Sequence, residues 1–225
     1  MQSGNMLFDI ATWLIPLVIA IVLHEISHGW VANAFGDPTA RDLGRLSPNP
    51  IRHVDPIGTV ALPLVLAVSG APVFGWAKPV PVVRKRLRNP RVHMMLVALA
   101  GPGMNLLLAL VAVFALALAL GGGGRPEGGL HLFLVANLQN FLVINIFLAF
   151  FNLLPIPPFD GGHVVEGLLP RPLARKWRRF GRLGFPLVIL LLVVLPMVSD
   201  VRIVERLVVP PVRAALDFYL ALAGL

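Results

Sequence analysis

The 225-residue sequence contains no cysteine and few charged residues. Without cysteine the chain forms neither disulfides nor thiolate metal ligands, so a bound metal must be held by histidine, aspartate or glutamate. Only 13% of the residues are charged, about half the share found in soluble domains, whereas 57% are hydrophobic. This composition argues against an ordinary soluble domain and indicates an integral membrane protein.

The first apolar stretch, residues 14–34, is interrupted by the polar sequence HEISH at residues 24–28. Histidines at positions i and i+4 lie on one face of a helix, so the imidazoles of His24 and His28 can bind the same metal ion. Glu25 can reach a water molecule on that metal, as in zinc hydrolases with an HExxH helix. An ionised glutamate in an apolar helix is unfavourable by about 2.5–3.5 kcal/mol. We therefore expect a metal or a water-filled cavity here; the plainer alternative is a buried polar cluster.

Several further stretches are long enough to cross a membrane, which requires about 20 apolar residues. We predict an all-α polytopic membrane protein with about four to six transmembrane helices, at residues 8–35, 92–120, 130–151 and 185–198, with 61–77 and 201–225 as uncertain additions. The first stretch has neither a preceding basic region nor a small-residue cleavage site, and we interpret it as a retained span.

Three segments lack the pattern of a long apolar helix. Residues 37–60 are polar and rich in proline and glycine, and we predict a short extended or β region near 40–47. Residues 61–77 are apolar but broken by proline and glycine, which fits a short span or a re-entrant segment. Residues 201–225 alternate charged and apolar residues and form either an interfacial helix or a further span.

The charged loops set the expected topology. Residues 78–91 and 171–182 are strongly basic, which predicts a cytoplasmic location and contact with the anionic lipids of the cell membrane. No soluble basic domain is present, so nucleic-acid binding is not expected. The Gly-rich residues 121–129 then lie outside, and a re-entrant segment 61–77 places HEISH toward the cytoplasmic side.

Two histidines make an incomplete zinc site, because catalytic zinc usually has three protein ligands and one open position. Only Glu25 and Asp160 are acids within or beside an apolar segment on the expected inner side, and Glu25 is needed as the base. Asp160 follows a helix end that is broken by prolines. We predict one zinc ion per chain, bound by His24, His28 and Asp160. The oligomeric state is not indicated.

The predicted chemistry is peptide-bond hydrolysis. Zinc lowers the pKa of its water toward about 7, and Glu25 accepts the proton and passes it to the leaving amine. An oxyanion donor is also required, and Asn152 is the first candidate, with Asn105 and His53 as weaker ones. Asn105 could instead bond a neighbouring helix. A transmembrane substrate must unwind, and it could then pair with the extended residues 40–60 by strand addition.

The sequence resembles the site-2 protease family of intramembrane zinc metalloproteases. The matching segments are HEISH at 24–28, SPNPIRHVDPIGT at 47–59, FGWAKPVPV at 74–82, ALAGPGMN at 98–105 and NLLPIPPFDGG at 152–162. The resemblance implies a three-helix catalytic core, zinc on the two histidines and the aspartate, Glu25 as base, and cleavage of transmembrane protein substrates in regulated intramembrane proteolysis. Residues 1–225 are expected to form one membrane-embedded metalloprotease domain without PDZ or CBS modules, with its core at about 8–165 and a C-terminal helical region at about 166–225.

Two other functions use the same residues. A metal-ion transporter or channel would place several metal sites along an ion path, whereas this sequence has one cluster with a general base beside it. A catalytically inactive scaffold that binds membrane helices would have no need for Glu25.

Overall fold

The computed structural model describes residues 6–69, 75–121, 128–199 and 203–225, and within them it contains helices but no β-strand. Three of these helices are long and apolar enough to cross a membrane: α1 (Met6–Ala34), α4 (Val92–Leu120) and α5 (Gly129–Asn152). The all-α polytopic class is confirmed. The described residues hold three such helices rather than the expected four to six, because the other apolar segments are short or interrupted.

The remaining elements are short. They are α2 (Thr39–Asp42), η1 (Pro50–His53), η2 (Pro56–Ala61), α3 (Leu62–Ser69), η3 (Arg84–Arg86), α6 (Asp160–Leu168), α7 (Arg171–Phe180), η4 (Gly181–Leu183), α8 (Gly184–Ile189), η5 (Leu190–Val194), α9 (Leu195–Val198), α10 (Ile203–Leu207) and α11 (Val209–Leu222). The η elements are 3₁₀ turns, except for η2 and η5, which are π turns.

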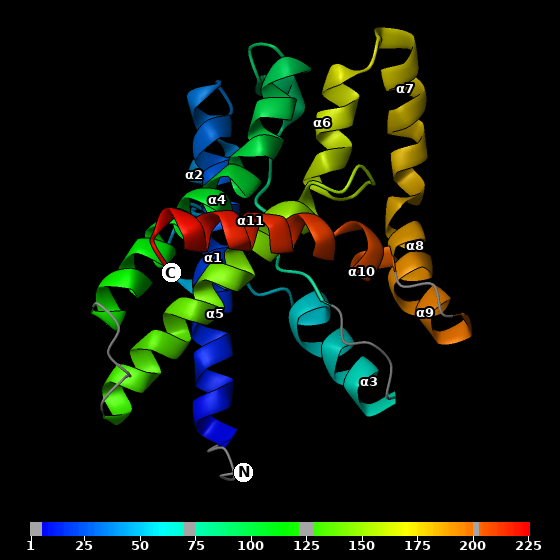
Figure 1. Cartoon of the computed structure of the whole chain (residues 1–225). Helices are drawn as coiled ribbons and strands as arrows, with labels where there is room; N and C mark the ends of the chain where they lie inside the picture. The colour runs from blue at the N-terminus through cyan, green and yellow to red at the C-terminus, as the bar shows by residue number, and fades with distance from the viewer. Residues whose placement is uncertain (1–5, 70–74, 122–127, 200–202) are drawn as a thin grey trace.

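The three long helices pack together, with α4 in contact with both α1 and α5 (Figure 1). Small residues such as Ala109 and Ala112 are fully buried on α4, which allows neighbouring helices to approach closely. Large apolar side chains, including Leu107 and Val111, are exposed on the same helix. A helix with a small-residue packing face and a large apolar outer face suits a bundle surrounded by lipid.

The extended region predicted near residues 40–47 is wrong. Residues 39–42 form α2, and residues 43–46 are turns. The fully buried Asp37 explains the difference, because its Oδ1 accepts hydrogen bonds from the backbone N–H and the hydroxyl of Thr39 and closes an Asx turn at the start of α2. The described residues between 40 and 60 therefore offer no strand edge to a substrate.

The apolar segment after residue 56 leaves the bundle and returns to the place where it started. The backbone N–H of Trp76 donates to the carbonyl of Gly58 at 3.1 Å, and the Thr59 hydroxyl donates to the Trp76 carbonyl at 2.9 Å. α3 lies between these two ends and has only 8 residues. The short helix and the meeting of the two ends favour the re-entrant interpretation over a span. Residues 70–74 lie outside the described residues.

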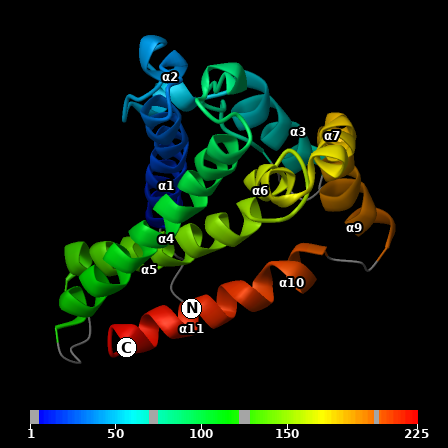
Figure 2. The same ribbon diagram turned by 90° about the horizontal axis from the view of Figure 1, so that it is seen from above.

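The C-terminal region adds two further features. The elements α7, η4, α8, η5 and α9 follow one another as one rod from residue 171 to 198 (Figure 1). The 14-residue α11 lies across the bundle against α5 and α4, where the Tyr219 hydroxyl donates to the Leu106 carbonyl at 3.1 Å (Figure 2). At about 1.5 Å per residue α11 spans about 21 Å, which is too short to cross a bilayer core of about 30 Å.

Candidate functional site

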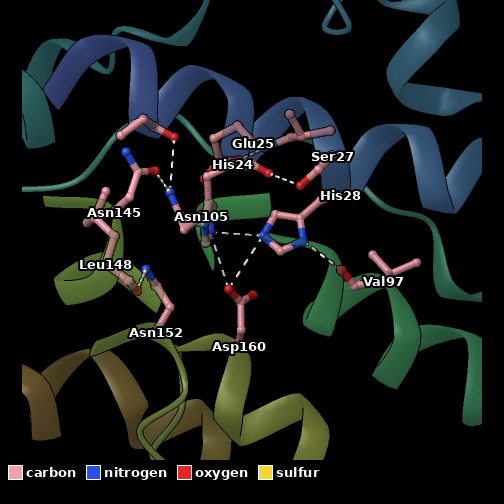
Figure 3. A network of polar contacts seen from close by, with 12 residues as sticks. His24, Glu25, Ser27, His28, Val97, Asn105, Asn145, Leu148, Asn152 and Asp160 are labelled. Atoms are coloured by element: carbon pink, nitrogen blue, oxygen red, sulfur yellow. Dashed lines mark hydrogen bonds and ion pairs between the residues drawn. The ribbon is translucent and has the colours of Figure 1, made fainter. Parts of the chain in front are cut away.

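The three predicted metal ligands meet in one place. His24 and His28 lie one turn apart on α1, and Asp160 is the first residue of α6 (Figure 3). Asp160 Oδ2 lies 3.3 Å from His24 Nε2 and 3.4 Å from His28 Nε2, and the two Nε2 atoms are 3.1 Å apart. Both histidines are buried, so these ligand-type atoms face each other away from bulk solvent.

Hydrogen bonds on the far side of each ring fix the tautomers. His28 Nδ1–H donates to the carbonyl of Val97 at 2.7 Å, and His24 Nδ1–H donates to Asn105 Oδ1 at 2.6 Å. Both partners are acceptors, so the neutral rings carry their protons on Nδ1 and present bare Nε2 lone pairs. Asp160 Oδ2 is buried and has no hydrogen-bond donor. With neutral rings, three lone-pair donors converge on one point, and a bound cation would satisfy all of them. Two imidazoles with one carboxylate form a ligand set that suits zinc.

Gly101 on α4 faces this cluster. A Cβ atom at this position would lie 2.5 Å from His24 Cε1 and from His28 Nε2, and 2.6 Å from His24 Nε2. These distances are far below ordinary contact, so only glycine leaves room for the imidazoles and for an ion between them. Gly101 belongs to the segment ALAGPGMN, which carries part of the family resemblance, but the sequence alone did not connect it with the metal ligands.

Asn105 lies behind His24 rather than at the cavity. Its Nδ2 donates to Asn145 Oδ1 at 2.8 Å, and Asn145 Nδ2 donates to the Phe141 carbonyl at 2.8 Å, so every orientation in this chain of amides is determined. Both asparagines are completely buried. The bond to a neighbouring helix, one of the two alternatives for Asn105, is therefore present, and the same side chain orients His24.

We expect Asn105→Leu to weaken zinc binding by about 10- to 100-fold, the usual effect of removing a group that orients a histidine ligand. Leucine has a similar volume but cannot accept the Nδ1–H of His24. Zinc affinity is measured by competition with a chelator. Asn137→Leu is the matched control, because the Asn137 amide donates within its own helix, to Phe133. Equal zinc affinity of Asn105→Leu and the wild type would contradict this role.

Glu25 lies beside the metal-type cluster and is held by an extended segment, residues 75–83, which we call the strap. The N–H of Val80 in the strap donates to Glu25 Oε2 at 2.8 Å. Arg45 donates to the carbonyl of Lys78 at 2.7 Å, and Asp37 accepts the N–H of Val83 at 2.5 Å. Two largely buried charged residues thus fix the strap on both sides of its contact with Glu25.

A cavity of about 560 Å³ opens onto these groups. Its walls include His24, Glu25, His28 and Asp160, together with apolar groups from the strap and the helices, among them Trp76 and Phe159. An apolar cavity with a few convergent polar groups is the usual form of a ligand or substrate site.

The remaining site candidates occupy different positions. Asn152 lines the cavity, and its Nδ2 donates to the Leu148 carbonyl of its own helix at 2.9 Å. His53 is buried in the loop, donates from Nε2 to the Ser47 carbonyl at 2.9 Å, and is not among the residues that line the cavity. Their suggested oxyanion roles remain predictions.

Asp160 is positioned by the anchoring of α6. Glu166, six residues further on and 4% exposed, accepts hydrogen bonds from Arg84 Nη1 at 2.7 Å and Arg178 Nη2 at 2.5 Å. Burial alone would raise the pKa of Glu166, but the hydrogen bonds from Arg178 and Arg84 outweigh it and lower the pKa below its usual value. The ionised carboxylate therefore joins α6 to α7 and to the end of the strap, a junction that sequence patterns did not reveal.

The fold and the site together define a multi-pass membrane protein with a buried His-His-Asp cluster and an adjacent glutamate. Residues 130–195 match Peptidase family M50. "Putative zinc metalloprotease YwhC" of Bacillus subtilis is 39% identical over 188 residues, which cover 84% of this chain and 82% of the relative. "Putative zinc metalloprotease Rip2" of Mycolicibacterium smegmatis is 29% identical over 191 residues, covering 84% and 68%. No solved structure gives a significant match.

The chain therefore belongs to peptidase family M50, the site-2 protease family, and it is a membrane-embedded zinc metalloprotease. The family resemblance drawn from the sequence is confirmed.

Proposed function

We propose that the protein is an intramembrane endopeptidase that hydrolyses peptide bonds within transmembrane segments of other membrane proteins. The observation that carries this proposal is the convergence of His24 Nε2, His28 Nε2 and Asp160 Oδ2 next to Glu25, in a cavity lined by the three membrane-spanning helices, the strap and α6. A hydrolytic centre surrounded by spanning helices is suited to a substrate that itself lies in the membrane.

One zinc ion per chain would be held by His24, His28 and Asp160. When bound, zinc supplies a Lewis acid that lowers the pKa of water to about 7 and polarises the peptide carbonyl. Among the described residues this is the only cluster of three metal-type ligands. A single cluster does not favour the alternative of a metal-ion path, which needs successive sites.

Glu25 is the residue that would take up and return the proton. Its Oε2 accepts the Val80 N–H, and its Oε1 has no hydrogen bond within the described part of the chain. One oxygen thus keeps the carboxylate oriented, while the other remains available to a proton. The strap therefore orients the Glu25 carboxylate by a hydrogen bond, as Asn105 orients the His24 ring.

Three further parts of the proposal concern the whole chain. Residues 1–225 form one metalloprotease domain in which α1, α4 and α5 are the catalytic core. The active site lies toward the cytoplasmic side, because the basic residues 84–91 and 171–182 lie at the same end of the bundle as the C-terminus of α1 (Figure 1). Asn152 is the candidate oxyanion donor, since its amide lines the cavity.

The test is cleavage of a single-span membrane protein by the purified enzyme, with the cut located by mass spectrometry. We expect cleavage within the apolar span, loss of cleavage after zinc is removed by a chelator, and recovery when zinc is restored. Cuts confined to the segments outside the span would contradict intramembrane proteolysis. Metal flux into vesicles without any cleavage would favour a transporter instead.

A further inference from the structure

A second cavity, of about 530 Å³, lies between α6, α7 and residues 157–159. Figure 1 shows α6 and α7 side by side at the end of the bundle that carries the basic loops. The groups that line this cavity include Arg175, Arg178, Arg179, Arg182, Trp177 and His163. We call it the arginine pocket.

The arginines reach the pocket because of their spacing. Positions 175, 178, 179 and 182 follow the pattern i, i+3, i+4 and i+7, which places them on one face of a helix. The other basic residues of α7, Arg171 and Lys176, are not part of the lining. The four arginines of this face therefore line one cavity, whereas Arg171 and Lys176 lie outside it.

The charge in the pocket is not balanced by the protein. Arg178 pairs with Glu166, which also receives a hydrogen bond from Arg84. Arg175, Arg179 and Arg182 form no ion pair or hydrogen bond with any described residue. Glu166 is the only acid among the lining residues, so several guanidinium groups face one hollow with a single carboxylate between them. Such a concentration of one charge attracts a counter-ion.

The walls are fixed rather than loose. Trp177 Nε1–H donates to the Gly162 carbonyl at 2.8 Å, which holds the indole ring against α6. Pro157 and Phe159 provide an apolar surface. A basic segment whose only role was to keep its loop on the cytoplasmic side would need no cavity. It would also need no tryptophan held in place beside its arginines.

We propose that the arginine pocket binds one phosphate-bearing anion. Guanidinium groups pair with phosphate oxygens through two parallel N–H donors, and several of them in one cavity surround a phosphate from more than one direction. The same chemistry occurs in the headgroup of an anionic phospholipid and in free phosphate. The apolar residues 184–198 follow α7 directly in the rod, which places the arginines at the depth where lipid headgroups lie.

An anion bound in the arginine pocket would lie next to a wall that this pocket shares with the catalytic cavity. Pro158, Phe159 and His163 line both cavities, and Gly162, the hydrogen-bond partner of Trp177, is two residues from Asp160. The two cavities therefore share the wall formed by this loop, but the arginines face only one of them and the His-His-Asp cluster faces only the other. Anion binding is thus testable without any measurement of proteolysis.

The experiment titrates the purified protein in neutral detergent with short-chain phosphatidylglycerol, short-chain phosphatidylcholine or inorganic phosphate, and counts bound molecules by native mass spectrometry. We expect the wild type to bind one phosphatidylglycerol more tightly than phosphatidylcholine. Arg175→Gln/Arg179→Gln should weaken this binding by about thirtyfold, since each basic residue near a membrane surface contributes about fivefold. Inorganic phosphate that binds as tightly as phosphatidylglycerol would support the site and identify free phosphate as its source.

The matched control is Arg171→Gln/Lys176→Gln, which removes the same charge from the same helix outside the pocket. It should bind phosphatidylglycerol like the wild type. Zinc content and the midpoint of thermal unfolding establish that both double variants are folded. Equal weakening in the two variants, no weakening in Arg175→Gln/Arg179→Gln, or equal affinity for the two lipids would overturn the proposal.

Discussion

Replacing Gly101 by alanine is expected to remove zinc from the purified protein and to abolish proteolysis. The added methyl group would lie about 2.5 Å from atoms of both histidine rings, which is more than 1 Å inside ordinary carbon contact distances. The rings are held from behind by Val97 and Asn105 and cannot retreat without breaking those hydrogen bonds. The methyl group therefore occupies the volume that a metal ion needs.

Gly103→Ala is the control for this change. Gly103 belongs to the same helix, and a Cβ atom there would meet no other atom within 4 Å. The control should keep its zinc and its activity, with equal or slightly higher helix stability. Zinc is quantified by elemental mass spectrometry, and thermal unfolding shows whether the fold is retained. A folded Gly101→Ala protein with a full complement of zinc would show that the His-His-Asp cluster is not the metal centre.

Replacing Glu25 by glutamine is expected to leave zinc bound while cleavage falls by about 10²- to 10⁴-fold, the range attributed to one general base. Glutamine keeps the shape of the side chain, and its carbonyl oxygen can still accept the Val80 N–H. It cannot take up a proton at neutral pH. The effect should therefore appear in kcat rather than in metal content.

Asp9→Asn provides the comparison, because it removes a carboxylate from an exposed position on the same helix. This variant should cleave the single-span substrate at the wild-type rate. If Glu25→Gln loses zinc together with activity, Glu25 is a ligand rather than the base. If it retains both, another group accepts the proton.

The local part of the site was predictable from the sequence. Two histidines four residues apart fall on one helical face whatever the rest of the chain does, and an acid after a proline-broken helix end falls at the start of the next helix. His24, His28 and Asp160 follow from these short-range rules together with the direction of each span. The three spanning helices were predictable for the same reason, since each is a long apolar run.

The parts that were missed depend on pairs of residues far apart in the chain. Arg45 holds the strap through a carbonyl 33 residues away, and Asp37 binds an N–H 46 residues away. Nothing in the local pattern of residues 37–47 shows that these charges are buried, so the segment was interpreted as extended. Gly101 was missed likewise, because the clash that makes it necessary is with another helix.

The distance along the chain between Glu25 and Asp160 has a consequence for biosynthesis. Glu25 and both histidines are made 132 to 136 residues before Asp160, which at 5–20 residues per second corresponds to about 7–27 s of translation. During that interval α1 can already reside in the membrane beside other newly inserted chains. A metal site that needs Asp160 is incomplete until the third spanning helix and the start of α6 have been synthesised. If Asp160 is the third zinc ligand, the nascent chain cannot complete its zinc site during that interval.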